Sequence, residues 1–326
     1  MNELLIKNGM VYSYIFEGYH AIKLQRADIY IDDGCIKEIK PGIEKGCDML
    51  DATGCIVLPG MVNMCANTFT ARITSGLLCD RRAGLKQVGP MLELAAEILD
   101  ADEIRAIAMS GLWETVSSGA TAVAERYPAA AGALAPGMSR AAAELGIQLL
   151  TIGKDVDDAI IAESAVSCAH LGKPYDGLER ILSGVNMTIG TGYFDSCMIS
   201  EMRAVACSVK QHTKDAGAYR ASDAFYSATV VNGRVFDAER YGRIGQGFNG
   251  DVSVVCMDRF APLSYPLAQY VYGANAGDVR HVVCGGVALK RDYKPADYLS
   301  EPLAQAREKT ETAICRLWGE ARRSIL

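Results

Sequence analysis

The stretch from Ile56 to Thr68 divides the sequence into two patterns. It contains an apolar run, the turn Pro59-Gly60, and a second short apolar run that ends in small polar residues. Short strands alternate with turns before it, whereas long helical stretches alternate with short apolar strands after it. Such a change at a Pro-Gly turn indicates that a small β module passes into a parallel α/β domain here.

The two patterns predict different elements. Before the turn we expect strands at 4–6, 11–15, 27–31, 36–39 and 55–58, separated by Asn8-Gly9, Asp32-Asp33-Gly34 and Lys40-Pro41-Gly42. After it we expect strands at 61–65, 121–125, 147–152 and 184–191, and helices at 87–99, 102–118, 156–171, 177–182, 198–214 and 221–231, with an Ala-rich helix ending at Gly146. The alternation predicts βα units and a parallel sheet.

Composition excludes several classes of protein. The chain has 326 residues, half of them hydrophobic, and a net charge of −6, which argues against nucleic acid as a main partner. Glu3 and Lys7 interrupt the first ten residues, so we expect neither a signal peptide nor a membrane span there. The eleven cysteines are scattered without a Cys-x-x-Cys pair, so we expect them to be mostly buried small side chains in a cytoplasmic protein.

The phrase Leu58-Pro59-Gly60-Met61-Val62-Asn63 resembles the start of the metal barrel in the amidohydrolase superfamily, in its cytosine-deaminase and chlorohydrolase branch. In that family a His-x-His metal pair follows, and here Cys65 and Asn67 hold those two positions. The family's last barrel strand ends in Gly-Thr-Asp, where the Asp binds the metal, and here Gly192 follows Gly190-Thr191. The family implies Zn or Fe, but these degenerate positions lead us to expect no cofactor and no catalytic residues.

The resemblance continues in Ala228-Thr229-Val-Val-Asn232-Gly233 and in the return phrase from Gly242 to Val255. It implies an α/β fold, with a truncated TIM-like (β/α) barrel and a composite β-sandwich. We expect the sandwich at 1–58 and 234–295, the barrel remnant at 59–233, and a C-terminal helix at 296–326. From Pro59 to Gly233 there are 175 residues, whereas a closed barrel takes about 250. Two or three βα units of about 30 residues are therefore missing, between 152 and 184.

Other candidate site residues are weak. Cys168 and His170 could supply two metal ligands, or a thiolate with a base, and Asp195 could replace the lost strand-end acid by a shifted turn. Helical packing and a solvated loop are the simpler interpretations. His20, His212 and His281 lie in contexts that favour surface or packing roles. The motif from Gly245 to Gly250 matches Gly-x-Gly-x-x-Gly, but it precedes a strand, so we interpret it as a turn.

Three hypotheses follow. The leading one is an amidohydrolase-like pseudoenzyme, a structural or regulatory subunit. The alternative is a metal-dependent hydrolase or deaminase that acts on C–N bonds of a cyclic amide or amine, with its site completed by a partner chain. The third is a module that binds heterocyclic amines or amides without chemistry. Missing strands leave open sheet edges, so we expect a homo- or hetero-oligomer, with a full-length amidohydrolase paralogue as the most natural partner, and no membrane.

Overall fold

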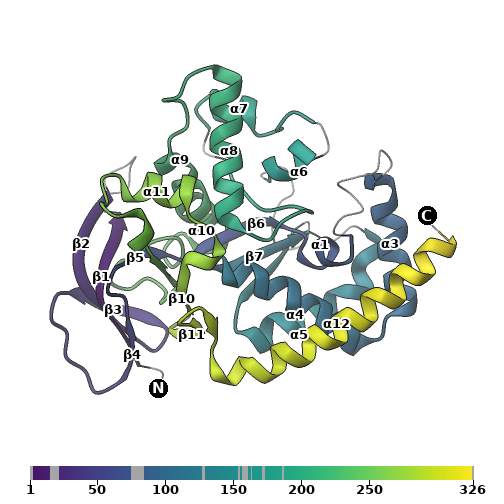
Figure 1. Cartoon of the computed structure of the whole chain (residues 1–326), viewed down its shortest axis with the longest axis horizontal. Coiled ribbons are helices and arrows are strands. Elements are labelled where there is room, and N and C mark those ends of the chain that lie inside the picture. Colours follow the sequence, from purple (N-terminus) through teal and green to yellow (C-terminus); the bar gives the residue numbers. More distant parts are fainter. Residues whose placement is uncertain are drawn as a thin grey trace.

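A computed structural model describes residues 3–14, 22–74, 84–126, 129–152, 155, 161–162, 164–170, 173–185 and 187–324. A twisted β-sheet lies at one side of the molecule, and a parallel sheet with its surrounding helices lies at the other (Figure 1). A long C-terminal helix runs along the outside of the helical part. No helix among the described residues is both long enough and apolar enough to cross a membrane.

The large sheet combines the two ends of the chain. Its nine strands are β1 (Leu4–Tyr14), β2 (Ile22–Asp32), β3 (Cys35–Lys40), β4 (Asp48–Asp51), β5 (Cys55–Pro59), β9 (Val252–Cys256), β10 (Val279–Cys284), β11 (Val287–Arg291) and β12 (Lys294–Pro295). Their order is β12-β11-β10-β9-β5-β1-β2-β3, and β4 pairs with β1. The N-terminal and C-terminal halves meet where β5 pairs antiparallel with β9.

The prediction of a turn at Asn8-Gly9 is wrong. Asn8-Gly9 lies inside the single strand β1, as an irregularity at which the pairing with β2 shifts register and Asn8 takes a φ of 66°. The strand continues because Gly9 lets β1 pass close to Val57: an added Cβ would lie 2.3 Å from Val57 Cγ2. The turn at Asp32-Asp33-Gly34 is confirmed as the β2–β3 hairpin, with positive φ at Asp33 and Gly34.

The second sheet is parallel and buried. It has the order β6 (Met61–Ala66), β7 (Ala120–Arg126) and β8 (Gln148–Ile152). The helices around it are α1 (Thr68–Thr74), α3 (Gly84–Ile98), α4 (Ala101–Ser117) and α5 (Ala135–Leu145), with a 3₁₀ turn at Ala129–Leu134. The predicted helix at 102–118 is confirmed as α4. This helix begins where Asp100 and Glu103 form a capping box.

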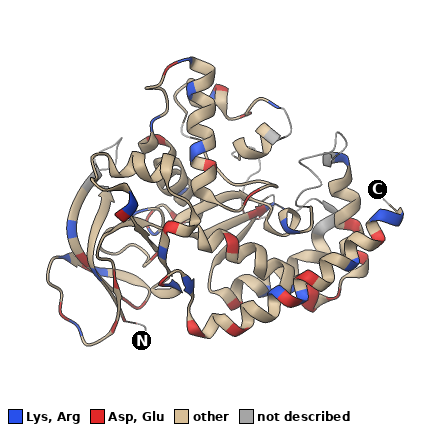
Figure 2. Ribbon diagram, in the orientation of Figure 1, with Lys and Arg blue, Asp and Glu red and all other residues tan. Residues whose placement is uncertain are grey.

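The rest of the chain is mostly helical. It contains α6 (Ala165–His170), α7 (Leu178–Leu182), α8 (Met198–Thr213), α9 (Ala221–Tyr226), a π-helical segment (Ser227–Val231), α10 (Asn232–Asp237), short 3₁₀ turns at Asp258–Phe260 and Ala276–Asp278, α11 (Pro266–Gly273) and α12 (Asp297–Ser324). Of the expected helix at 156–171, only 165–170 is helical, as α6; 161, 162 and 164 are not helical, and the other residues lie outside the described part of the chain. Acidic and basic side chains alternate along α12 (Figure 2), and its buried residues include Leu303 and Leu317.

The expected strand at 184–191 is not a regular strand, but its last part lies beside β6. The Met64 N–H donates to the Ile189 carbonyl at 3.3 Å, and the Gly192 N–H donates to the Cys65 carbonyl at 2.7 Å. Ala66 and Gly192 form a parallel bridge. Four parallel segments therefore stand side by side, in the order 187–192, β6, β7 and β8. This is an incomplete TIM-like barrel, because β8 has no strand on its other side among the described residues.

Residues that follow the parallel segments cover part of one face of the parallel sheet. One face of the parallel sheet contributes apolar side chains such as Val62, Met64 and Ala122 to a small buried cluster. Val235, Phe236 and Tyr241, from α10 and the segment after it, pack against this cluster. The inner face of the half-barrel is therefore covered in part by residues that follow the last parallel segment.

Candidate functional site

Two asparagines fix the first and last parallel segments to each other. Asn63 of β6 accepts from the Thr191 N–H at 3.0 Å, and its amide donates to Thr191 Oγ1 at 2.8 Å. Asn232, at the start of α10, accepts from the Ile189 N–H and donates to the carbonyls of Ile189 and Val62. Both side chains are fully buried. The ends of the two segments are therefore held in a defined register.

Gly190 allows this close approach. A Cβ on Gly190 would lie 2.1 Å from the Cys65 backbone nitrogen and 2.8 Å from its Cα. Only glycine leaves room for two backbones at this spacing. Asn63, Gly190 and Asn232 thus join β6 to the segment 187–192. We call this junction the seam.

Polar groups gather where β6 and β7 end. Glu125 and Arg126 are the last residues of β7, and Ala66 of β6 is paired with Glu125. Asn67 follows β6 directly and leads into α1. The carboxyl ends of parallel strands are where barrels of this type place the groups that bind and transform a substrate.

Asn67 is buried without a hydrogen-bond partner. Its exposed fraction is 0%, and neither its amide nitrogen nor its amide oxygen makes a hydrogen bond to any residue that the structure describes. A buried amide normally has its donors and acceptor satisfied, because an unpaired polar group in the interior costs about 1–3 kcal/mol. The Asn67 amide therefore has hydrogen-bonding capacity that no other described residue uses.

Glu125 is a neutral acid at neutral pH. Burial raises its pKa to about 8, against the opposing effect of hydrogen bonds from the Thr68 hydroxyl and from the backbone of Phe69 and Thr68. The Thr68 Oγ1 lies 3.1 Å from Glu125 Oε2. A carboxylic acid held in this state can donate a proton or a hydrogen bond.

Cys65 lies beneath this cluster as a thiol. It is buried, and desolvation raises its pKa to about 12, although the Arg126 guanidinium acts in the opposite direction. The sulfur therefore remains protonated at neutral pH and is a poor metal ligand or nucleophile.

Ser164 and Ser167 occupy the space beside Gly192 where the family's metal-binding Asp would project. Gly192 has a φ of 64°, and a Cβ there would lie 2.2 Å from Ser167 Oγ and 2.7 Å from Ser164 Cβ. Glu201 of α8 holds this segment: it accepts from Ser164 Oγ and from the Ala165 N–H, both at 2.7 Å. Burial raises the pKa of Glu201 to about 7.

The weaker candidates are dispersed. Cys168 is buried in the main hydrophobic core, and the side chain of His170 lies outside the described residues, as does all of His20. Asp195 accepts from the Cys197 N–H at 2.9 Å and so shapes the turn before α8. His281 is bonded to backbone groups in the large sheet.

The residues present do not fit a complete family metal site. Cys65 is a protonated thiol, Asn67 is an amide, and Gly192 has neither a side chain nor room for one. Within the described residues, no group of three or more His, Cys, Asp or Glu side chains is placed to hold a metal ion. This chain alone does not supply the ligand set.

Two acids of the cluster were not predicted from the sequence. Glu125 did carry a signal, because it is the first charged residue after a wholly small and apolar run in a strand. Glu201 carried none, because it lies inside a helix and meets Ser164 only through the tertiary fold.

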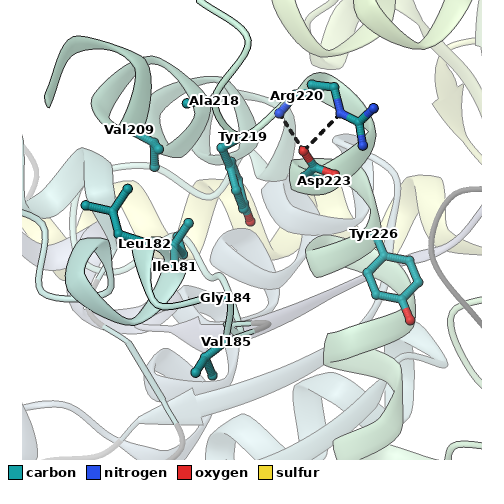
Figure 3. A pocket seen from close by; sticks show the side chains of 10 residues that line it. All are labelled: Ile181, Leu182, Gly184, Val185, Val209, Ala218, Tyr219, Arg220, Asp223 and Tyr226. Carbon is teal, nitrogen blue, oxygen red and sulfur yellow. Dashed lines mark hydrogen bonds and ion pairs between the residues drawn. The ribbon is translucent and has the colours of Figure 1, made fainter. Parts of the chain in front are cut away.

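A separate cavity lies beside the C-terminal part of α8. It has a volume of about 470 Å³ and lies between α7, the turn before α9, and α9 (Figure 3). Leu182 and Val185 line it, with exposed fractions of 47% and 52%. At its rim Arg220 pairs with Asp223. Val209, which also lines it, is eight residues beyond Glu201, about 12 Å along the helix.

A parallel βα sheet with polar groups at its strand ends, attached to a β-sheet built from both ends of the chain, defines a (β/α) barrel protein with an incomplete barrel. The chain belongs to the Amidohydrolase family, whose profile matches residues 91–289.

Its relatives include deaminases. It is 25% identical over 415 positions to a 5-methylthioadenosine/S-adenosylhomocysteine deaminase of Haloarcula marismortui, covering 90% of this chain and 94% of the relative. It is 30% identical over 145 residues to a 5'-deoxyadenosine deaminase of Methanopyrus kandleri, which covers 41% of this chain and only 33% of the relative. The first alignment is longer than the 326-residue chain by 89 positions, so at least that many have no counterpart here.

Solved structures share the fold. An adenosine deaminase from Xanthomonas campestris with bound zinc superposes with a TM-score of 0.74 at 17% identity, covering 95% of this chain and 98% of that one. An atrazine chlorohydrolase from Arthrobacter aurescens complexed with zinc gives 0.77 at 15% identity, covering 95% and 100%.

These comparisons correct two expectations. The pseudoenzyme interpretation is wrong, because the relatives are named as deaminases and the structural neighbours include zinc-bound hydrolases. The expectation of no cofactor is wrong as well, because members of this fold are crystallised with zinc. Both predictions assumed that a chain without the family's metal ligands at three positions has neither activity nor a metal.

Proposed function

We propose that this chain is a subunit of a deaminase of the amidohydrolase class, one that hydrolyses a C–N bond of a cyclic amine such as a purine nucleoside. Its active site is completed by a second chain. The observation that carries the proposal is two buried polar side chains at the carboxyl ends of β6 and β7: Asn67, whose amide has no partner among the described residues, and Glu125, which the Thr68 hydroxyl contacts.

The residues of this chain can recognise and protonate such a substrate. The unpaired Asn67 amide offers a donor and an acceptor, the combination that an aminated ring presents at its edge. The neutral acid Glu125 can donate a proton to a ring nitrogen or to a leaving amine. Burial excludes water from both groups, which would strengthen the hydrogen bonds that they make to a bound ring.

The need for a second chain follows from the incomplete ligand set and the open sheet. The described residues provide no group able to hold a metal ion, and β8 has no further strand beside it in the described part of the chain. In a closed barrel, a strand and a helix would cover this edge. The partner would therefore bring the remaining βα units and the missing metal ligands, as a full-length paralogue would.

The cavity between α7 and α9 supports the same arrangement. Leu182 and Val185 are exposed apolar side chains that precede the seam segment at 187–192. In a complete barrel, the helix of the preceding unit would pack against this face. A partner helix could fill the cavity and bury both side chains (Figure 3). A cytoplasmic location is part of this proposal.

The test is an assay of the subunit with and without its partner. The tagged chain is purified from its own host together with any bound protein, and release of ammonia from 5'-deoxyadenosine is measured. We expect activity in the complex and none in the isolated chain. Asn67→Ala should lower kcat/KM of the complex at least tenfold. His212→Ala, on the exposed last turn of α8, is the matched control and should leave it unchanged. A pure complex without deaminase activity on any aminated heterocycle would refute the proposal.

A further inference from the structure

Two cysteines face each other across the junction of the N-terminal and C-terminal strands. Cys55 is the first residue of β5, Cys256 is the last residue of β9, and the two are directly paired in the antiparallel register. Both belong to the same apolar cluster of the large sheet. Their side chains therefore project from the same face of the sheet.

The hydrogen-bond pattern shows which kind of pair this is. The Met257 N–H donates to the Gly54 carbonyl at 3.1 Å, and the Gly60 N–H donates to the Asp251 carbonyl at 2.8 Å. Bonded and non-bonded pairs alternate along an antiparallel ladder. Cys55 and Cys256 come next to the bonded pair Gly54 and Met257, so they form a non-bonded pair. In such pairs the Cα atoms are about 4.5 Å apart, which lies inside the range of about 4.4–6.8 Å that a disulfide needs.

The surroundings give the two sulfurs different roles. Cys256 is partly exposed and lies beside the phenol of Tyr293, which is itself 47% exposed. Cys55 is 2% exposed, and the Arg280 guanidinium is within hydrogen-bond reach of its sulfur. Burial raises the pKa of Cys55 to about 11, and Arg280 acts against this rise. A reagent from solution therefore meets Cys256 first.

We propose that Cys55 and Cys256 form a reversible disulfide when the protein meets a low-molecular-weight disulfide such as oxidised glutathione. The Cys256 thiolate attacks one sulfur of the reagent, which gives a mixed disulfide and releases one glutathione as its thiolate. That thiolate takes the proton of Cys55, whose sulfur attacks the sulfur of Cys256. The second glutathione then leaves. Two protein thiols are oxidised, and one reagent disulfide is reduced to two thiols.

The disulfide would link the N-terminal strands to the C-terminal strands where β5 pairs with β9. Cys55 precedes the Pro59-Gly60 turn, and Cys256 lies in the first strand after the return from the helical part. The cross-link would enclose about 200 residues, including the whole parallel sheet and the seam. A disulfide that closes a long loop restricts the unfolded chain and so stabilises the folded one. This inference does not depend on the proposed function.

The test treats the full chain with oxidised glutathione at pH 8, blocks free thiols with N-ethylmaleimide, and analyses a non-reduced digest by mass spectrometry. We expect a linked peptide pair that contains Cys55 and Cys256 and that disappears on treatment with dithiothreitol. The oxidised protein should melt several degrees higher than the reduced protein. Cys207→Ser, at an exposed thiol of α8, is the matched control and should retain both results, whereas Cys256→Ser should lose both.

Two results would overturn the inference. One is a stable glutathione adduct on Cys256 with no link to Cys55. The other is complete labelling of both thiols by N-ethylmaleimide after the exposed Cys207 and Cys315 have been oxidised. A linked protein with an unchanged melting temperature would overturn the stabilising role. The linked peptide in the wild-type chain decides the first question even if Cys256→Ser does not fold.

Discussion

Replacing Asn232 with alanine should open the seam. The Asn232 side chain makes three buried hydrogen bonds, with the N–H and carbonyl of Ile189 and the carbonyl of Val62, at 3.1, 2.7 and 2.6 Å. Asn232→Ala leaves the Ile189 N–H unpaired and removes one donor from each of the two carbonyls, of which the Ile189 carbonyl still accepts from the Met64 N–H. At about 1–3 kcal/mol for the unsatisfied N–H and about 0.5–1.5 kcal/mol for each hydrogen bond lost at a carbonyl, the loss of unfolding free energy should be about 2–5 kcal/mol.

The assay is urea unfolding followed by circular dichroism, together with hydrogen exchange of single amides. The Gly192 amide, which donates to the Cys65 carbonyl across the seam, should lose protection in Asn232→Ala. Arg234→Ala is the matched control: Arg234 lies in the same helix, is exposed, and donates a hydrogen bond of 3.2 Å to the Tyr226 hydroxyl. Arg234→Ala should lower the free energy of unfolding by less than about 1 kcal/mol. Equal losses in the two variants would refute the assignment of the seam to Asn232.

Two further predictions concern the same region. Gly190→Ala should destabilise the protein by at least about 1–3 kcal/mol in urea unfolding, because its Cβ would meet the Cys65 backbone at 2.1 Å. Gly319→Ala, in open space within α12, should be neutral or slightly stabilising, and the reverse order would contradict this account. The pKa of Glu125 is raised to about 8 in the folded protein from about 4.3 in the unfolded chain, so its contribution to stability is full below pH 4.3 and is lost as the pH rises to 8. Glu125→Gln should therefore flatten the decline of the urea midpoint between pH 5 and 8, and a variant that kept the wild-type slope would show that another group titrates.

The sequence predicted the parts of the fold that depend on backbone geometry. The Pro59-Gly60 turn, the capping residue Asp100 and the Asp33-Gly34 hairpin each act over a few neighbouring residues, so their effect is visible in the local pattern. The phrases that contain Asn63 and Asn232 pointed to a barrel because these side chains bond to the backbones of the first and last parallel segments.

The site was less predictable. Ser164 and Glu201 meet across 37 residues and lie next to Gly192 only in the folded chain, so no local pattern could show that they fill the place of the missing acid. The functional interpretation failed for a different reason. The family's ligand pattern depends only on which residues stand at Cys65 and Asn67, whereas the burial of the Asn67 amide without a partner among the described residues becomes visible only in the structure.

The most direct test of a deaminase site shared between two chains is kcat/KM for 5'-deoxyadenosine, measured on the complex purified from the native host. The wild-type complex should release ammonia, the separated chain should not, and Asn67→Ala in this subunit should lower kcat/KM at least tenfold without changing the amount of bound partner. Full activity in a complex that carries Asn67→Ala and Glu125→Gln together would contradict the central claim, because these residues would then lie outside the active site.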